Sequence, residues 1–190
     1  MKLPIVAYGD PVLKKLATDI DQDYPNLKEL IDNMFETMYA ASGVGLAAPQ
    51  IGLPIRLFVV DASPFADDEP ALENFKKVFI NPVIEEESGE KWDFNEGCLS
   101  IPDIRENVNR HRDLKIKYYD EQFTLHEEAF TGLAARVIQH EYDHIQGKLF
   151  TDRISPLRKT MLKNRLDAIA KGAVRVDYKM RFPLANKRKR

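Results

Sequence analysis

The feature that most constrains the fold of this chain is a pair of histidines, His140 and His144, on the apolar face of a predicted helix. Residues four apart in a helix project from the same face, so the two imidazoles can bind one metal ion. Leu133 and Val137 continue this face, which turns it towards the protein interior. Glu141 lies about 100° around the helix from His140, within reach of a water molecule on the metal. Burial of an unpaired imidazole costs free energy, so the alternative is a pair of core histidines with hydrogen-bonding partners.

A catalytic metal needs a third protein ligand, and the sequence leaves several candidates open. The extended metallopeptidase pattern would supply a third histidine, but Phe150 stands in its place. No glutamate follows Glu141, which excludes the arrangement of thermolysin-like peptidases. Upstream, Cys98 is the only cysteine, and a thiolate is a strong ligand for borderline or soft divalent ions. The acidic side chains that remain downstream are Asp152, Asp167 and Asp177.

Cys98 lies between two polar segments, 95–97 and 100–102, which predicts an exposed bend rather than a core strand. A lone cysteine is otherwise a small buried hydrophobic residue. His111 lies in a charged stretch and His126 in a predicted hairpin, so neither is an obvious third ligand. A single cysteine cannot form an internal disulfide, which fits a reducing compartment.

The hydrophobic pattern predicts an α+β fold, because strands and helices occur without regular βαβ alternation. We expect short antiparallel strands packed around a central metal-binding helix, with an N-terminal helix and a C-terminal helix. A surface loop is predicted over 61–76, and one catalytic domain over 1–172 precedes a basic C-terminal extension, 173–190. The predicted helices span 24–41, 132–144 and 155–172; the predicted strands span 55–60, 114–120 and 122–128, with a strand, a turn and a strand over 78–87.

The charges of the chain are distributed unevenly, although its 190 residues have a formal net charge of only −2. Residues 1–144 hold 14 basic and 27 acidic side chains, a net charge of −13. Residues 145–190 hold 14 basic and three acidic side chains, a net charge of +11. The basic part predicts either a solvated helix and tail or an element that contacts an acidic partner. No apolar run approaches the roughly 20 residues that span a bilayer, so we expect no membrane partner.

Three segments of the sequence are informative together: G-V-G-L-A-A-P-Q at 43–50, E-G-C-L-S at 96–100 and Q-H-E-Y-D-H at 139–144. They resemble the signature motifs of the bacterial peptide deformylase family, and their order and spacing match as well. The resemblance extends over roughly residues 3–170. It implies a metal site formed by Cys98, His140 and His144, with water in the fourth position. Family members typically use Fe²⁺, which Zn²⁺, Ni²⁺ or Co²⁺ can replace.

The resemblance also implies the reaction, which is removal of the N-formyl group from the N-terminal formylmethionine of new polypeptides, with release of formate in the cytoplasm. Glu141 is implied to take the proton of the attacking water and to pass it to the leaving amine. The side-chain amide of Gln50 and the backbone N–H of Leu99 are implied to stabilise the oxyanion of the tetrahedral intermediate.

Other residues are predicted to bind the formylated peptide. Gly43 and Gly45 allow a close backbone approach, so an extended peptide can pair with residues 44–46 as an added strand. Arg105 is a candidate for contacting the peptide backbone, although an exposed salt-bridging arginine is an equal alternative. Arg136 stands where we expect an apolar residue near the pocket mouth, and it is predicted either to favour acidic or polar groups of the peptide or to point to solvent. The walls of the methionine pocket are predicted to be Val44, Phe94, Leu133 and Val137, of which we expect one to belong only to the core.

Two other functions compete with this interpretation. An H-E-x-x-H zinc metallopeptidase uses nearly the same chemistry, but the chain lacks the downstream Glu or His of those enzymes. A non-enzymatic ribosome-binding metal protein would use a structural zinc site, and such sites usually have four ligands rich in Cys. Because deformylases act on chains leaving the ribosome, the basic C-terminal region is a candidate for contacting ribosomal RNA.

Overall fold

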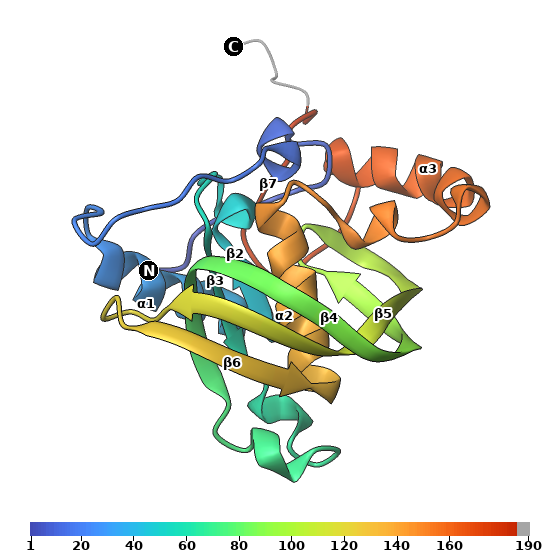
Figure 1. Cartoon of the computed structure of the whole chain (residues 1–190). Coiled ribbons are helices and arrows are strands. Elements are labelled where there is room, and N and C mark those ends of the chain that lie inside the picture. The colour runs from blue at the N-terminus through green and yellow to red at the C-terminus, as the bar shows by residue number, and fades with distance from the viewer. Residues whose placement is uncertain (186–190) are drawn as a thin grey trace.

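Helix α2 (Gly132–Ile145) lies against a five-stranded antiparallel sheet in the computed structural model, which describes residues 1–185 (Figure 1). The strand order is β2-β3-β4-β5-β6, so β2 and β6 form the two edges. The strands are β2 (Gly45–Ala47), β3 (Leu57–Asp61), β4 (Lys76–Cys98), β5 (Ile101–Tyr119) and β6 (Leu125–Thr131). The predicted α+β class with antiparallel strands around the histidine helix is therefore confirmed.

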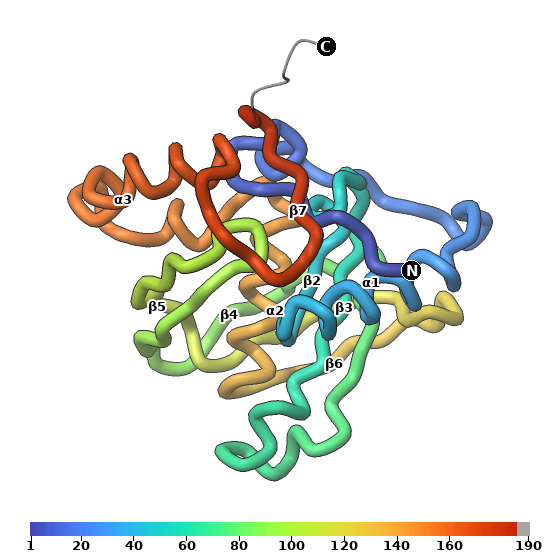
Figure 2. Tube along the Cα trace, turned by 180° about the vertical axis from the view of Figure 1, so that it is seen from behind, coloured from blue at the N-terminus to red at the C-terminus, as the bar shows by residue number. Residues whose placement is uncertain are grey.

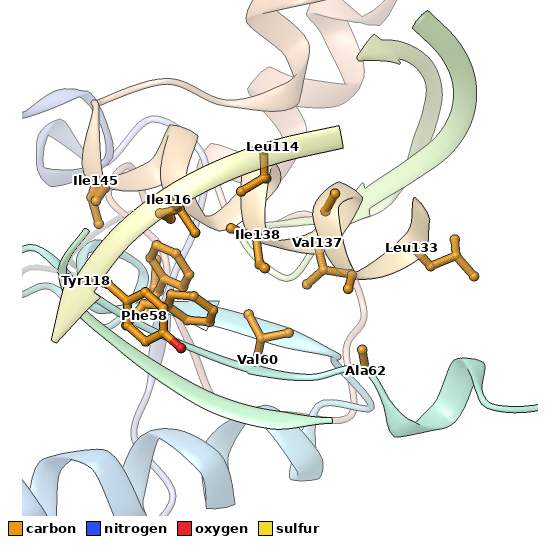
Figure 3. Packing of buried hydrophobic residues seen from close by; sticks show 14 of the residues in the cluster. Phe58, Val60, Ala62, Leu114, Ile116, Tyr118, Leu133, Val137, Ile138 and Ile145 are labelled. Carbon is orange, nitrogen blue, oxygen red and sulfur yellow. The ribbon is translucent and has the colours of Figure 1, made fainter. Parts of the chain in front are cut away.

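Strand β3 shows why both faces of the sheet are covered. Successive side chains of a strand point to opposite faces, and the run Leu57–Val60 is apolar throughout. Phe58 and Val60 pack with α2 and β5, as Figure 3 shows. Leu57 and Val59 pack on the other face against helix α1 (Leu27–Ala40). The residues that α1 buries there are Ile31, Met34, Phe35 and Met38, whose spacing of three and four places them on one face of the helix.

The long hairpin of β4 and β5 differs from the prediction over 78–87. One continuous strand replaces the expected strand, turn and strand, because Asn81 and Pro82 form an irregularity in the β4–β5 register rather than a turn. Asn81 adopts a left-handed conformation with φ of 48°. The chain does bend within the predicted range 95–102, but only at Leu99–Ser100, since β4 continues to Cys98. The bend is not exposed as predicted, because Ser100 is buried.

The acidic segment 61–76 supplies the cap of α2. It contains two short 3-10 helices, Ser63–Phe65 and Pro70–Leu72. The backbone N–H of Leu133 donates to Glu69 Oε1 at 3.1 Å, in the first turn of α2. A carboxylate satisfies the free N–H groups of a helix N-terminus and interacts favourably with the helix dipole. The segment therefore fixes the N-terminal end of α2, the helix whose C-terminal half carries the two histidines.

Two segments far apart in the sequence, 5–6 and 180–181, lie side by side (Figure 2). Helix α3 (Pro156–Ala170) begins at Ser155, whose hydroxyl accepts a hydrogen bond from the Arg158 N–H, as the sequence predicts. After α3 the chain returns, and β7 (Met180–Arg181) pairs in parallel with β1 (Ile5–Val6). The basic tail residues 186–190 lie outside the described residues. Within residues 1–185, no helix is both long enough and apolar enough to cross a membrane.

Candidate active site

Cys98, His140 and His144 meet at one point, where the end of β4 approaches the C-terminal half of α2. One ligand atom of each residue lies within 4.8 Å of those of the other two. Cys98 Sγ is 3.4 Å from His144 Nε2. Among the described residues, the three downstream aspartates that the sequence left open do not join this cluster. The structure thus brings together the three residues that the resemblance implied.

The donor set suits one divalent transition metal ion. A thiolate and two imidazoles are typical ligands of Zn²⁺ and related ions, and three protein ligands leave a position open for water or substrate. His144 is buried, and its Nε2 faces Cys98 Sγ at the point where the three residues meet. His140 Nδ1 lies 2.9 Å from Glu96 Oε2, which leaves Nε2 of that ring for the metal. The residues present therefore fit the metal that the family implies.

Glu96 orients His140 and is itself fully hydrogen-bonded. Arg110 donates to both of its oxygens, at 2.7 and 3.0 Å, and Arg136 Nη1 donates to Oε1 at 2.9 Å. Burial alone would raise the pKa of Glu96, but the hydrogen bonds from His140 and Arg110 hold it well below its ordinary range. The carboxylate therefore remains ionised and fixes the ring of one metal ligand.

The same network extends to a second buried carboxylate. Arg110 Nη1 donates to Asp143 Oδ2 at 2.8 Å, and Arg153 donates to both oxygens of Asp143. Burial alone would raise the pKa of Asp143, but Arg153 and Arg110 hold it below its ordinary range. Sequence reasoning missed this network, although Glu96 and Asp143 both lie within the recognised motifs.

Arg136 belongs to this network, and the prediction that it points to solvent is wrong. Its side chain is 2% exposed. Its two terminal nitrogens donate to Glu96 and to the backbone oxygens of Val108 and Trp92. Arg136 also lines the cavity described below, so its contact with polar groups of a peptide stays a prediction. The ring of Trp92 also lies against it, with the guanidinium carbon 4.6 Å from the ring centroid.

Glu141 is buried beside the metal ligands without full hydrogen bonding. Its Oε2 has no partner within residues 1–185, and burial raises its pKa to about 7. A Cβ atom added to Gly45 would lie 2.7 Å from Glu141 Cδ, a contact that folded proteins do not tolerate. The absence of a side chain at Gly45 is therefore what allows this carboxylate to occupy its position.

Gln50 is 1% exposed and its amide has a fixed orientation. Oε1 accepts a hydrogen bond from the Ala47 N–H at 2.9 Å, so Nε2 must be turned away from that group. Nε2 lies 3.5 Å from Cys98 Sγ and 3.3 Å from Ser100 Oγ. The backbone N–H of Leu99 donates to no group within residues 1–185. Two donors thus lie next to the metal ligand Cys98.

A cavity of about 710 Å³ opens onto these groups. Its lining includes Cys98, His140 and Glu141, together with Gln50 and Leu99. Of the predicted substrate-binding residues, the lining contains Val44, Gly45, Phe94, Arg105 and Val137.

Two of the predicted substrate-binding residues, Leu133 and Arg105, have other contacts in the structure. Leu133, in the first turn of α2, is absent from the cavity lining and belongs to the buried core cluster, so it is the one member of the four that belongs to the core alone (Figure 3). Arg105 lies at the cavity, but its guanidinium donates to the side chain and the backbone oxygen of Asn95. It is therefore held in place by Asn95 rather than by an acidic partner.

Sequence reasoning also missed one wall of the cavity. Residues 175–178, which follow α3, line it together with the three motifs. They lie beyond the part of the chain that the resemblance covers, and no pattern in their sequence indicates contact with the active site.

Comparisons with known proteins agree with this site. The family described as polypeptide deformylase matches residues 2–160. A peptide deformylase from Christiangramia forsetii is 61% identical over 98% of this chain and 99% of its own. A solved peptide deformylase from Legionella pneumophila is 38% identical, with a TM-score of 0.80, and the match covers 92% of this chain and 99% of that one. A solved peptide deformylase from Thermotoga maritima is 43% identical, with a TM-score of 0.74 and coverage of 82% and 99%.

These matches extend over nearly the whole chain and include the residues that carry the cluster of Cys98, His140 and His144. The rival interpretation as a zinc metallopeptidase is therefore not favoured. The chain belongs to the polypeptide deformylase family.

Proposed function

We propose that this chain carries out the reaction of its family at the cavity described above, with Cys98, His140 and His144 as the metal ligands and Glu141 as the proton carrier. The chain is a metal-dependent deformylase that removes the formyl group from the N-terminal formylmethionine of newly synthesised polypeptides. The observation that carries the residue assignment is the unpartnered buried oxygen of Glu141 beside three ligand atoms within 4.8 Å of one another.

Cys98, His140 and His144 would hold one divalent ion, and we propose Fe²⁺ in the cell, with Zn²⁺, Ni²⁺ or Co²⁺ able to replace it. When bound, such an ion lowers the pKa of water and polarises a carbonyl group. The chain contributes the ligand orientation, because Glu96 fixes His140 and the β4–β5 hairpin fixes Cys98. Metal analysis of the protein purified under anaerobic conditions tests the choice of ion.

Glu141 moves the proton. Its carboxylate accepts a proton from the attacking water and donates it to the nitrogen of the methionine as the C–N bond to the formyl carbon breaks. The products are formate and a free N-terminal amine. Because Glu141 is 4% exposed, bulk water does not compete for that proton.

Gln50 and Leu99 stabilise the developing oxyanion. The Gln50 Nε2–H and the Leu99 N–H are both adjacent to Cys98, and the Leu99 N–H has no partner within the described chain. Donors that are already oriented stabilise a transition state without reorganising during the reaction.

The open edge of β2 binds the peptide. On one side β2 pairs with β3, through Gly45 and Val60 among others, and it is the first strand of the sheet. Its other edge pairs with no strand of the described residues, so an extended peptide can add there as a further strand. Val44, Phe94 and Val137 then form apolar walls for the methionine side chain.

A formate-release assay tests this function. The metal-loaded protein should release formate from formyl-Met-Ala-Ser and should leave acetyl-Met-Ala-Ser intact. A product cut at the Met-Ala peptide bond would instead establish a peptidase. Cys98→Ala should abolish stoichiometric metal binding, and full metal occupancy in that variant would refute the ligand set.

We also propose that the enzyme acts in the cytoplasm at the ribosome, with the basic C-terminal region in contact with ribosomal RNA. The exposed side of α3 supports this, since the basic side chain of Lys163 is exposed there. Lys163→Glu and removal of 186–190 should each weaken ribosome binding and its salt dependence. Unchanged, salt-insensitive binding in both variants would contradict the proposal.

A further inference from the structure

The segment that follows α3, residues 173–185, is here called the C-terminal strap. It is anchored on the N-terminal strand, because the Ile5 N–H donates to the Lys179 oxygen and the Ala7 N–H donates to the Arg181 oxygen, each at 2.9 Å. Figure 2 shows the strap leaving α3 and crossing the back of the molecule to reach β1. Its path is therefore fixed by backbone hydrogen bonds at its far end.

Between α3 and that anchor, the strap passes the active-site cavity. Arg175, Val176, Asp177 and Tyr178 line the same cavity as Cys98 and Glu141. Val176 and Tyr178 are half-buried, whereas the two charged residues are exposed. The strap is thus a wall of the cavity, and its half-buried side chains are the ones that contact the protein.

The Tyr178 hydroxyl donates to the backbone oxygen of Leu99 at 2.8 Å. Leu99 and Ser100 form the turn that joins β4 to β5, directly after the metal ligand Cys98. From the other end of the chain, the Tyr8 N–H donates to the Ser100 oxygen, also at 2.8 Å. Both carbonyl groups of the turn are therefore held by segments that lie outside the hairpin.

This arrangement bears on the Leu99 N–H. Each residue has only two soft backbone dihedrals, so a hydrogen bond that fixes the Leu99 carbonyl limits rotation about the Leu99 Cα. The N–H on the other side of that Cα is then restricted as well, and within residues 1–185 it has no partner of its own. An oxyanion donor must be oriented before the charge develops if it is to accelerate the reaction.

We propose that Tyr178 is a positioning residue for deformylation, whose hydroxyl holds the Leu99–Ser100 turn in the conformation that presents the Leu99 N–H to the oxyanion. The inference rests on the proposed role of Leu99 as a donor. The alternative is that the ring of Tyr178 only packs, since it lies with Leu99 against the same core cluster. Removing the hydroxyl alone separates these roles, because the ring and its packing remain.

Tyr178→Phe tests the proposal in the full-length, metal-loaded enzyme. We expect kcat for formyl-Met-Ala-Ser to fall about tenfold, with KM changed less than about twofold, because only the transition state uses the oxyanion donor. The matched control is Tyr119→Phe. Tyr119 is half-buried against the same cluster, and its hydroxyl has no partner among the described residues. This variant should keep both constants within about twofold of the parent enzyme.

A second measurement addresses the donor itself. The Leu99 amide resonance should shift in Tyr178→Phe and should stay in place in Tyr119→Phe. A lower melting temperature with unchanged kcat would overturn the proposal, as would an unchanged Leu99 resonance.

Gln50→Ala separates the inference about the strap from the proposed oxyanion site. Loss of one oxyanion donor typically reduces kcat by about 10²–10³. If Gln50→Ala has this effect while Tyr178→Phe has none, the strap inference fails and the oxyanion assignment stands. If Gln50→Ala also has no effect, the oxyanion assignment itself fails.

Discussion

Glu96 and Glu141 are the same residue type at the same exposure, 4%, yet their surroundings give them opposite properties. Glu96 accepts four hydrogen bonds, which hold its pKa well below the ordinary range. Glu141 has one oxygen without a partner within the described residues, and burial raises its pKa to about 7. Both lie next to His140. The difference shows that burial alone does not raise the pKa of a carboxyl group. The number of neighbouring hydrogen-bond donors determines whether the pKa rises or falls.

Glu141→Ala gives the largest expected effect. The proton carrier is lost, so kcat for formyl-Met-Ala-Ser should fall by about 10²–10⁴. The metal content should stay near one per chain, because Glu141 is not a ligand. Formate release and metal analysis of the same sample check both statements. Unchanged turnover would remove Glu141 from the mechanism.

Glu96→Ala should act on stability instead. The change leaves Arg110 and Arg136 buried without their main partner, which costs about 3–5 kcal/mol of unfolding free energy. It should also weaken metal binding about 10–100-fold, because His140 loses its orienting carboxylate. Chemical denaturation and metal titration measure the two effects.

The control for Glu96 is Glu127→Ala, which removes an exposed ion pair with Lys115. Such a pair contributes at most about 1 kcal/mol. Equal destabilisation by the two variants would show that the buried network contributes no more to the unfolding free energy than an exposed ion pair does.

Gly45→Ala tests the contact that places Glu141. The new methyl group would occupy space held by the Glu141 carboxylate, so that side chain must move away. We expect kcat to fall about 10–100-fold, since small displacements of a positioned group have such costs. Unfolding free energy should change by less than about 1 kcal/mol, because the clash is with the end of the flexible Glu141 side chain, which can turn into the adjoining cavity. Full activity would show that Glu141 works equally well elsewhere in the cavity.

Asp152 extends the comparison to a carboxylate near the surface, with the smallest expected effect. Burial alone would raise its pKa, but hydrogen bonds from Lys14 and Lys159 lower it to about 2. A pKa lower in the folded than in the unfolded state stabilises the fold above about pH 4, and this contribution is lost as the pH falls towards 2. Solvent screening limits the contribution to about 1 kcal/mol.

Asp152→Asn should therefore be less stable than the parent protein at pH 7, and the two should converge near pH 2. Denaturation curves across that range measure the difference. A gap that persists unchanged at the lowest pH would exclude this origin.

The two histidines of the cluster were predictable from the sequence, because residues four apart share a face of any helix that contains both. Spacing left the third candidate ligand open, and only the resemblance of the motif around Cys98 to the family pattern singled out that residue. The Glu96 network was not predictable in the same way. Glu96 meets Arg110 across the β4–β5 hairpin and Arg136 from a helix, and the irregular register of that hairpin cannot be derived from hydrophobic alternation.

Arg136 shows why the surroundings of a single residue are hard to predict from its neighbours in the sequence. As a single charged residue in an apolar stripe it indicated solvent or substrate, whereas its actual partners come from three separate parts of β4 and β5. The position of the strap was equally hard to predict from the sequence, since the hydrogen bond from Tyr178 to Leu99 joins residues 79 apart.

The pairing of β1 with β7 has a consequence for the order in which the enzyme is assembled. Ile5 pairs with Met180, so β1 must wait for a segment that is synthesised much later. Contacts between distant parts of a chain form late, because a long loop must close first. The sheet and α2 can fold while synthesis continues, but the wall formed by residues 175–178 is completed only once β7 is available to pair with β1. An enzyme that acts on nascent chains therefore completes its own active site late in its own folding.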